Sequence, residues 1–311
     1  MAYLGVDDSD EDLMQVGDNP NHIRILTREL WPEDIPYYVG KPLRVTDVKS
    51  SDLIPLKPEH LYDWARVVNN PHPMDRTRGR ALILVNPSRP RMLEQVAIKV
   101  QGFVEARGLS LETLGNWDGE ASTAMAARQT LALHGGAYPE VFKMQQRALR
   151  ALVNYAALHV GVPTSFKASN DRLELERPVF TRARGCKKAP LTLSNADDPT
   201  HRSDAVKDQW IVTERLGIGR RLDESNQIVA ANPFAIRPGD FVEATITLDI
   251  SIRGLRDRKG YIRFWVSRVA RICRKEQVPK ASRAPKPPPT VSTQPGLATM
   301  GDDVQWPADN E

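Results

Sequence analysis

The chain has 311 residues, of which 41% are hydrophobic and 26% are charged, and its formal net charge is +4 at pH 7. These values are typical of a soluble globular protein. Its two cysteines, Cys186 and Cys273, exclude a disulfide framework and a cysteine-rich zinc site, and its apolar runs are too short to span a bilayer. No charged-then-apolar leader opens the sequence, so we expect an intracellular protein, nuclear or cytoplasmic, with no membrane partner.

Composition divides the chain into five segments. They are an acidic disordered tail (1–20), an α/β-like portion (21–136), a central helix and linker (137–170), a β-rich portion with a basic hairpin (171–276) and a Pro-rich disordered tail (277–311). The acidic tail holds six carboxylates and no Lys or Arg, whereas residues 251–290 hold twelve Lys and Arg against two carboxylates. This polarity suits a protein that meets a polyanion, although two solvated tails would have the same composition.

The α/β-like portion alternates strand and helix patterns. Ala81–Val85 is a short apolar run typical of a buried strand. Ser88 precedes a helical spacing of apolar residues, which are Leu93, Val96, Ala97, Val100, Phe103 and Val104. A further strand is expected at Leu109–Leu114 and a further helix at Ala121–Leu133. This order predicts a βαβ unit.

Three polar residues, Asn86, Asn116 and Asp118, follow the expected strand ends of that unit. Open α/β sheets place their ligands at such ends, so these residues would form the centre of an enzyme site of unknown chemistry. Asn and Asp are also the commonest turn formers, and turn chemistry is the simpler reading of all three positions.

The pattern from Pro139 to Val160 predicts a long amphipathic helix that ends at Gly161. Its buried stripe is expected at Val141, Met144, Ala148, Ala151, Leu152, Tyr155 and Leu158. The other face aligns Lys143, Arg147, Arg150 and Asn154 in one row. Such a row suits a phosphate backbone, but it is also the solvated face that any amphipathic helix needs.

Beyond this helix, strand-like segments alternate with turns. Strands are expected at 173–182, 191–193, 210–216 and 227–231, followed by a β-hairpin. They predict an antiparallel sheet or a small barrel, and both a five-stranded barrel of the oligonucleotide-binding type and an ordinary sandwich are compatible with them. The expected fold class of the whole chain is therefore α+β. Arg184, Lys187 and Lys188 flank Cys186, where their charges favour its thiolate, although an incidental thiol in a basic loop is the simpler interpretation. The same loop predicts a basic patch beside the hairpin.

The hairpin is expected over residues 237–275 and has two different faces. Along its first arm one side is apolar, because strand side chains alternate: Val242, Ala244, Ile246, Leu248, Ile250 and Ile252. One side of its second arm carries Tyr261, Arg263, Trp265 and Arg271. Aromatic surfaces interleaved with cations are what single-stranded nucleic acid requires. A half-buried sheet edge with cross-strand pairs to Glu243 or Asp249 would show the same pattern.

The leading interpretation is a non-enzymatic nucleic-acid-binding protein that is weakly sequence-specific and favours single strands of DNA or RNA. Tyr261 and Trp265 would stack bases. The expected phosphate contacts are Arg263, Arg271, Arg274 and Lys275, with Lys143, Arg147, Arg150, Lys187 and Lys188 as secondary contacts. No phosphate loop, nucleophile with a base, or metal-ligand spacing occurs, so neither a cofactor nor a metal is expected. An interaction or assembly protein that uses charged tails is the second interpretation, and an enzyme at the βαβ strand ends is the third.

Overall fold

The computed structural model describes residues 1–6, 25–32, 35, 43–55, 57–70, 79–87, 95–166, 171–186, 188–223, 225–254 and 256–278. Most of the two segments predicted to be disordered tails, together with Ser88 and Lys187, lies outside these residues. Within the predicted acidic tail, Tyr3–Val6 forms a strand, and Tyr3 and Leu4 are buried.

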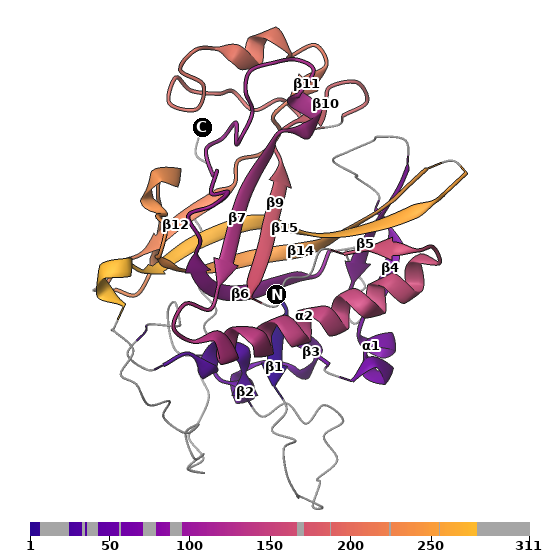
Figure 1. The fold of residues 1–311 in the computed structure, drawn as a ribbon, viewed down its shortest axis with the longest axis vertical. Coiled ribbons are helices and arrows are strands. Elements are labelled where there is room, and N and C mark those ends of the chain that lie inside the picture. The colour runs from indigo at the N-terminus through magenta and orange to yellow at the C-terminus, as the bar shows by residue number, and fades with distance from the viewer. Residues whose placement is uncertain are drawn as a thin grey trace, which may run out of the picture.

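The described part of the chain is mixed α+β and consists mostly of sheet (Figure 1). Its helices are α1 (Pro58–Trp64) and α2 (Pro139–Val160). Its strands are β1 (Tyr3–Val6), β2 (Ile25–Leu26), β3 (Leu53–Ile54), β4 (Arg66–Asn69), β5 (Gly79–Val85), β6 (Ala97–Val104), β7 (Arg128–His134), β8 (Thr164–Ser165), β9 (Arg172–Pro178), β10 (Thr181–Arg182), β11 (Trp210–Ile211), β12 (Gly217–Arg221), β13 (Ile228–Ala230), β14 (Phe241–Arg253) and β15 (Lys259–Cys273). None of the helices in the described ranges is long and apolar enough to cross a bilayer.

One ten-stranded sheet organises the molecule, in the order β13-β12-β15-β9-β7-β6-β14-β5-β4, with β8 paired to β15. Because β14 also pairs with β15, five of these strands form a closed circuit: β6, β7, β9, β15 and β14. The pairs within the circuit are antiparallel except β9 with β15, which is parallel. In Figure 1 the upright pair β7–β9 crosses in front of the long hairpin β14–β15, so the sheet is strongly curved.

Helix α2 lies beneath the curved sheet (Figure 1) and has the bounds that the sequence predicts. Pro139 occupies its first turn, and Gly161 ends it in the left-handed conformation at φ 69°. Its buried face is rotated from the predicted stripe, since Leu158 is 73% exposed while Gln145 is buried. The Gln145 side chain accepts from the backbone N–H of Gln101 and donates to its carbonyl, both at 2.9 Å, and so satisfies the open edge of β6.

The predicted helix after Ser88 is wrong, because its described part contains β6. Residues 96–104 satisfy a helical spacing and also a period of two, with Val96, Ile98 and Val100 buried. β-branched residues favour the strand. Gly102 allows the helix to approach, because a Cβ there would lie 3.0 Å from the ring of Phe142.

The second predicted helix, at Ala121–Leu133, is also wrong. Its first half is a turn followed by one 3₁₀ turn at Ala124–Ala126, and its second half is β7. Gln129, Leu131 and Leu133 alternate as buried residues along this strand, and Ala-rich composition hid that alternation. The strand expected at Leu109–Leu114 makes one bridge, from Ser110 to Thr130. The described residues therefore contain no βαβ unit in this region.

Most of the C-terminal strands join the ten-stranded sheet, and β10 and β11 pair with each other in a separate two-stranded sheet. The structure has β9, which begins one residue early at Arg172, and β10 in the region predicted at 173–182, β11 within 210–216 and β13 within 227–231, while residues 191–193 form no strand. Their partners include β6 and β7 from the portion predicted to be α/β-like, and β12 and β8 join β15 in parallel. The sheet is mixed because β15 pairs in parallel with β8, β9 and β12, whereas its other strand pairs, including those that link the two halves of the chain, are antiparallel.

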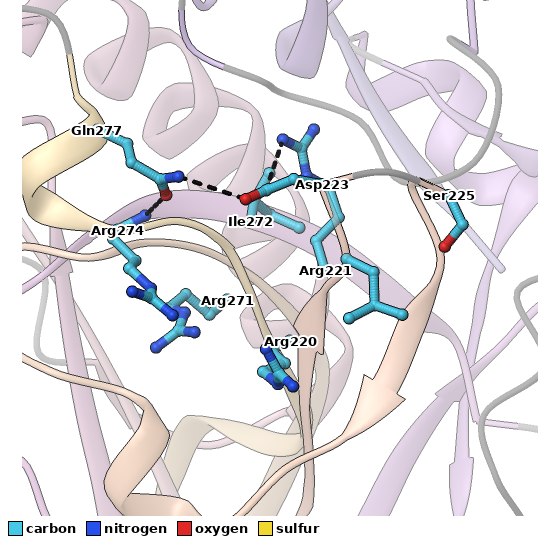
Figure 2. Close-up of a pocket in the computed structure, with 9 residues that line it drawn as sticks. Arg220, Arg221, Asp223, Ser225, Arg271, Ile272, Arg274 and Gln277 are labelled. Atoms are coloured by element: carbon cyan, nitrogen blue, oxygen red, sulfur yellow. Dashed lines mark hydrogen bonds and ion pairs between the residues drawn. The ribbon is translucent and has the colours of Figure 1, made fainter.

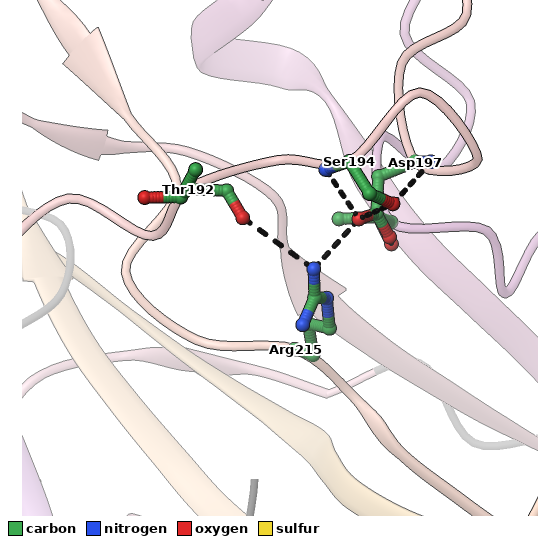
Figure 3. A network of polar contacts seen from close by, with 5 residues as sticks. Thr192, Ser194, Asp197 and Arg215 are labelled. Atoms are coloured by element: carbon green, nitrogen blue, oxygen red, sulfur yellow. Dashed lines mark hydrogen bonds and ion pairs between the residues drawn. The ribbon is translucent and has the colours of Figure 1, made fainter. Parts of the chain in front are cut away.

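A second, smaller core fills the lobe at the top of Figure 1, around β10 and β11. The carboxylate of Asp197 links several segments of this lobe by hydrogen bonds (Figure 3). It accepts from the hydroxyl of Thr113 at 2.6 Å, from the backbone and hydroxyl of Ser194 at 2.9 and 2.7 Å, and from Arg215 at 2.6 Å. Burial raises the pKa of this carboxyl, but these hydrogen bonds outweigh burial and hold the pKa well below its ordinary value of 3.8.

Replacing Asp197 by asparagine is expected to lower the free energy of unfolding at neutral pH by about 1–3 kcal/mol, because charged acceptors make the stronger hydrogen bonds. A carboxyl group whose pKa is lower in the folded than in the unfolded protein contributes its full stabilisation at pH values above the unfolded pKa. That contribution is lost as the pH falls through the folded pKa. The wild type should therefore lose more stability than Asp197→Asn when the pH is lowered from about 5 to about 2. Denaturant unfolding at several pH values measures this difference, and parallel pH profiles would contradict the role given to Asp197.

Candidate nucleic-acid interface

The hairpin β14–β15 forms as predicted, but two register shifts interrupt its faces, one between Phe241 and Val242 and one between Thr245 and Ile246. Ile246 pairs with Val266, whereas Thr245 pairs with Arg268, so Ser267 is an extra residue, a β-bulge, in the second arm. Beyond the bulge Arg271 stands opposite Val242, on the side that carries the apolar residues of the first arm. Arg271 therefore does not continue the row of Tyr261, Arg263 and Trp265, contrary to the prediction from strict alternation.

The remaining row on the hairpin is half-buried and already has partners. The guanidinium of Arg263 forms an ion pair with Glu176 at 2.6 Å, and that of Arg253 lies 5.7 Å from the ring centre of Tyr261. Trp265 pairs across the sheet with both Thr247 and Glu176. Arg263 is consequently less available to a phosphate than the sequence alone indicates.

The bulge directs Arg271 into a group of arginines at the base of the hairpin, which we call the arginine cluster: Arg220, Arg221, Arg237, Arg271 and Arg274. Four of them line one hollow, whose volume is about 310 Å³, and Figure 2 shows how they lie around it. A second hollow of about 410 Å³ shares Arg271 and Arg274 with the first and adds Arg237. Strand pairing brings these arginines together, because β12 runs parallel to β15 and places Arg220 beside Arg271. Three carboxylates, those of Asp223, Asp240 and Glu276, line the same two hollows.

Asp240 fixes the backbone on both sides of the arginine cluster through hydrogen bonds. One of its carboxylate oxygens accepts from the backbone N–H of Arg237 at 2.9 Å, and the other accepts from that of Lys275 at 3.0 Å. Gly239 adopts φ +87°, and a Cβ there would lie 2.6 Å from the Lys275 stem. The turn Pro238–Asp240 therefore connects the start of β14 to the chain that follows β15.

The electrostatics of the arginine cluster favour an anion. Burial lowers the pKa of Arg271, and repulsion by Arg274, Arg220 and Arg237 lowers it further against the attraction of Asp240. Within the part of the chain that the structure describes, the side chains of Arg220, Arg237 and Arg274 form no hydrogen bond or ion pair. An arginine remains protonated despite such repulsion. A bound anion would therefore reduce the repulsion between the guanidinium groups.

The other predicted contacts are dispersed. On α2, Lys143 forms an ion pair with Glu140 at 2.9 Å, Arg147 is exposed and Arg150 is half-buried. Lys188 forms an ion pair with Glu214, which also binds the buried Arg177 at 2.9 Å. Arg274 and Lys275 belong to the base of the hairpin, where the backbone of Arg274 is held by Gln277 at 3.0 Å.

The residues considered for an enzyme site serve the local structure. Asn86 donates to the carbonyl of Ser51 at 2.8 Å, Asn116 accepts from the backbone of Arg128 at 2.7 Å, and Asp118 accepts from Thr123 and from the backbone of Glu120. Cys186 is a partly exposed free thiol in a turn. Among the described residues, no three His, Cys, Asp or Glu side chains gather as metal ligands.

Sequence reasoning missed Arg220, Arg221 and Arg237. The first two lie in a Gly-Ile-Gly-Arg-Arg segment between the strands expected at 210–216 and 227–231, and Arg237 is the first residue of the expected hairpin. Paired arginines beside a turn, near a second basic run, are the signal that could have found them. Comparison of the chain with known protein families, with curated proteins and with solved structures finds no significant match.

Proposed function

We propose that the protein binds single-stranded nucleic acid without catalysing a reaction, and that the arginine cluster is its main phosphate contact. The observation that carries this proposal is the convergence of five arginines on two adjoining hollows, three of them without a side-chain partner among the described residues. Guanidinium forks match phosphate oxygens in two parallel hydrogen bonds. The two hollows adjoin and share Arg271 and Arg274, which suits successive phosphates of one strand better than a single small anion.

The closed circuit of strands supports the same function. In chain order its members are β6, β7, β9, β14 and β15, and around the circuit they follow the order first, second, third, fifth, fourth. This is the strand order of the oligonucleotide-binding barrel, although α2 here lies between the second and third strands instead of after the third. A fold alone does not fix a function, so this likeness is secondary to the arginine cluster.

Tyr261 and Trp265 are proposed as stacking residues on the hairpin, and Lys143, Arg147 and Arg150 of α2 as secondary contacts. The outer side of β9 offers less, because Glu174 and Glu176 pair there with Arg172 and Arg263. We therefore propose that the bound single-stranded nucleic acid starts at the base of the hairpin, where the arginine cluster lies.

Fluorescence anisotropy of labelled single-stranded and duplex oligonucleotides tests this function. We expect binding that prefers single strands and that weakens steeply between about 50 and 200 mM salt, because bound cations release counterions from the phosphates. The absence of binding at the lower salt concentration would contradict the proposal. Equal affinity for duplex and single strand would contradict its preference for unpaired bases.

A further inference from the structure

Beside the arginine cluster, the 3₁₀ turn Pro233–Ala235 holds an aromatic ring out in solvent. Phe234 is 68% exposed, although its side chain has no polar group that water could satisfy. Burying a phenylalanine is worth about 1.5–3 kcal/mol, so this exposure forgoes stability that the fold could have gained.

The position of Phe234 is fixed by its neighbours. The side chain of Asn232 accepts from the backbone N–H of Phe234 at 2.9 Å, and its carbonyl accepts from that of Ala235 at 2.8 Å. Ile236 is 3% exposed and anchors the far end of the turn in the main core. The ring therefore projects from a fixed backbone and not from a loose loop.

The same turn is connected directly to the arginine cluster. Arg271 donates to the carbonyl of Ala235 at 2.5 Å, and Ala235 and Arg237 both line one of the two hollows. Phe234 is thus the immediate chain neighbour of Ala235, which lines the hollow that Arg237 and Arg271 also line. Base-stacking proteins need this combination, with an aromatic face next to cations that hold the backbone.

We infer that Phe234 is a base-stacking residue, and that the arginine cluster and Phe234 together bind a nucleotide unit of a single strand. This inference rests on the proposed function and assigns its base-recognition element. A ring without hydrogen-bonding groups stacks on every base, so the contact is sequence-tolerant. In a duplex the bases are already stacked on one another, so the ring adds affinity for single strands only.

The test compares Phe234→Ala with Phe234→Trp in anisotropy titrations of single-stranded and duplex oligonucleotides. Phe234→Ala should weaken single-strand binding by about 5- to 150-fold and leave duplex binding unchanged, whereas Phe234→Trp should bind single strands at least as well as the wild type. Since the ring is exposed, both variants should unfold at the wild-type temperature. A single-stranded probe with 2-aminopurine should lose fluorescence on binding to the wild type and to Phe234→Trp, and should lose less on binding to Phe234→Ala, which keeps only Tyr261 and Trp265 for stacking.

The outcomes separate the two proposals. If Phe234→Ala binds single strands as the wild type does, while loss of the clustered arginines weakens binding, the stacking role is wrong and the proposed function stands. If Trp265→Ala weakens single-strand binding and Phe234→Ala does not, the stacking residue lies on the hairpin instead. A wild-type protein that binds no oligonucleotide removes the proposed function and this inference with it.

Discussion

Replacing Glu243 by alanine is expected to lower the free energy of unfolding by about 3–5 kcal/mol, because it leaves two cations buried without their shared carboxylate. The carboxylate of Glu243 lies 3.2 Å from the ammonium of Lys99 and 3.7 Å from the guanidinium of Arg28, and it accepts from Gln101 at 2.9 Å. All four side chains are buried or nearly so. Burial raises the pKa of Glu243, but Lys99 and Arg28 outweigh burial and lower it, so the group is ionised at neutral pH.

A double-mutant cycle separates this charge effect from a general loss of packing. Lys99→Met in the Glu243→Ala background should recover part of the lost stability, because it removes one uncompensated cation and keeps an apolar stem. Denaturant unfolding of the two single variants and the double variant measures the coupling. A loss below about 1 kcal/mol for Glu243→Ala would mean that the buried cations are solvated or paired in another way.

Replacing Arg220 and Arg274 together by glutamine is expected to weaken single-strand binding by about 2–4 kcal/mol, since each is proposed to make a charge-assisted contact to phosphate. The slope of log affinity against log salt should fall in magnitude by about 1.4 for a single strand, at about 0.7 for each lost phosphate contact. Neither side chain has a hydrogen bond or ion pair within the described ranges, so their removal should not destabilise the fold.

The matched control is Arg107→Gln with Lys207→Gln, two exposed cations that line neither hollow. This control changes the net charge by the same amount, so it measures the effect of overall charge on affinity. The arginine cluster is the phosphate site if its variant loses much more affinity and salt dependence than the control. Equal losses for the two variants would show that binding depends on net charge alone.

The sequence predicted an element correctly where residues close together in the chain determine it, and not where distant residues do. The bounds of α2 and the apolar arm of the hairpin were correctly predicted, because caps and alternation are local signals. Residues 97–104 were not, because their apolar residues fit both periods and the pairing of β6 with β14 decided between them. Gln145 was missed as a buried residue for a similar reason, since its partner is the distant backbone of Gln101.

The arginine cluster could not have been assembled from the sequence. Arg220 and Arg271 are 51 positions apart and meet only through the parallel pairing of β12 with β15. The bulge at Ser267 then moves Arg271 to the other side of the strand, and a single extra residue leaves no pattern in the sequence. The sequence therefore indicated the basic, aromatic character of the hairpin and not the place where its cations converge.

Ultraviolet crosslinking of a bound single-stranded oligonucleotide, followed by mass spectrometry of the crosslinked peptides, tests the central claim most directly. The arginine cluster and Phe234 predict crosslinks within residues 217–222, 233–240 and 268–277. Crosslinks confined to α2 or to the lobe around β10 and β11, with none in those three segments, would contradict it.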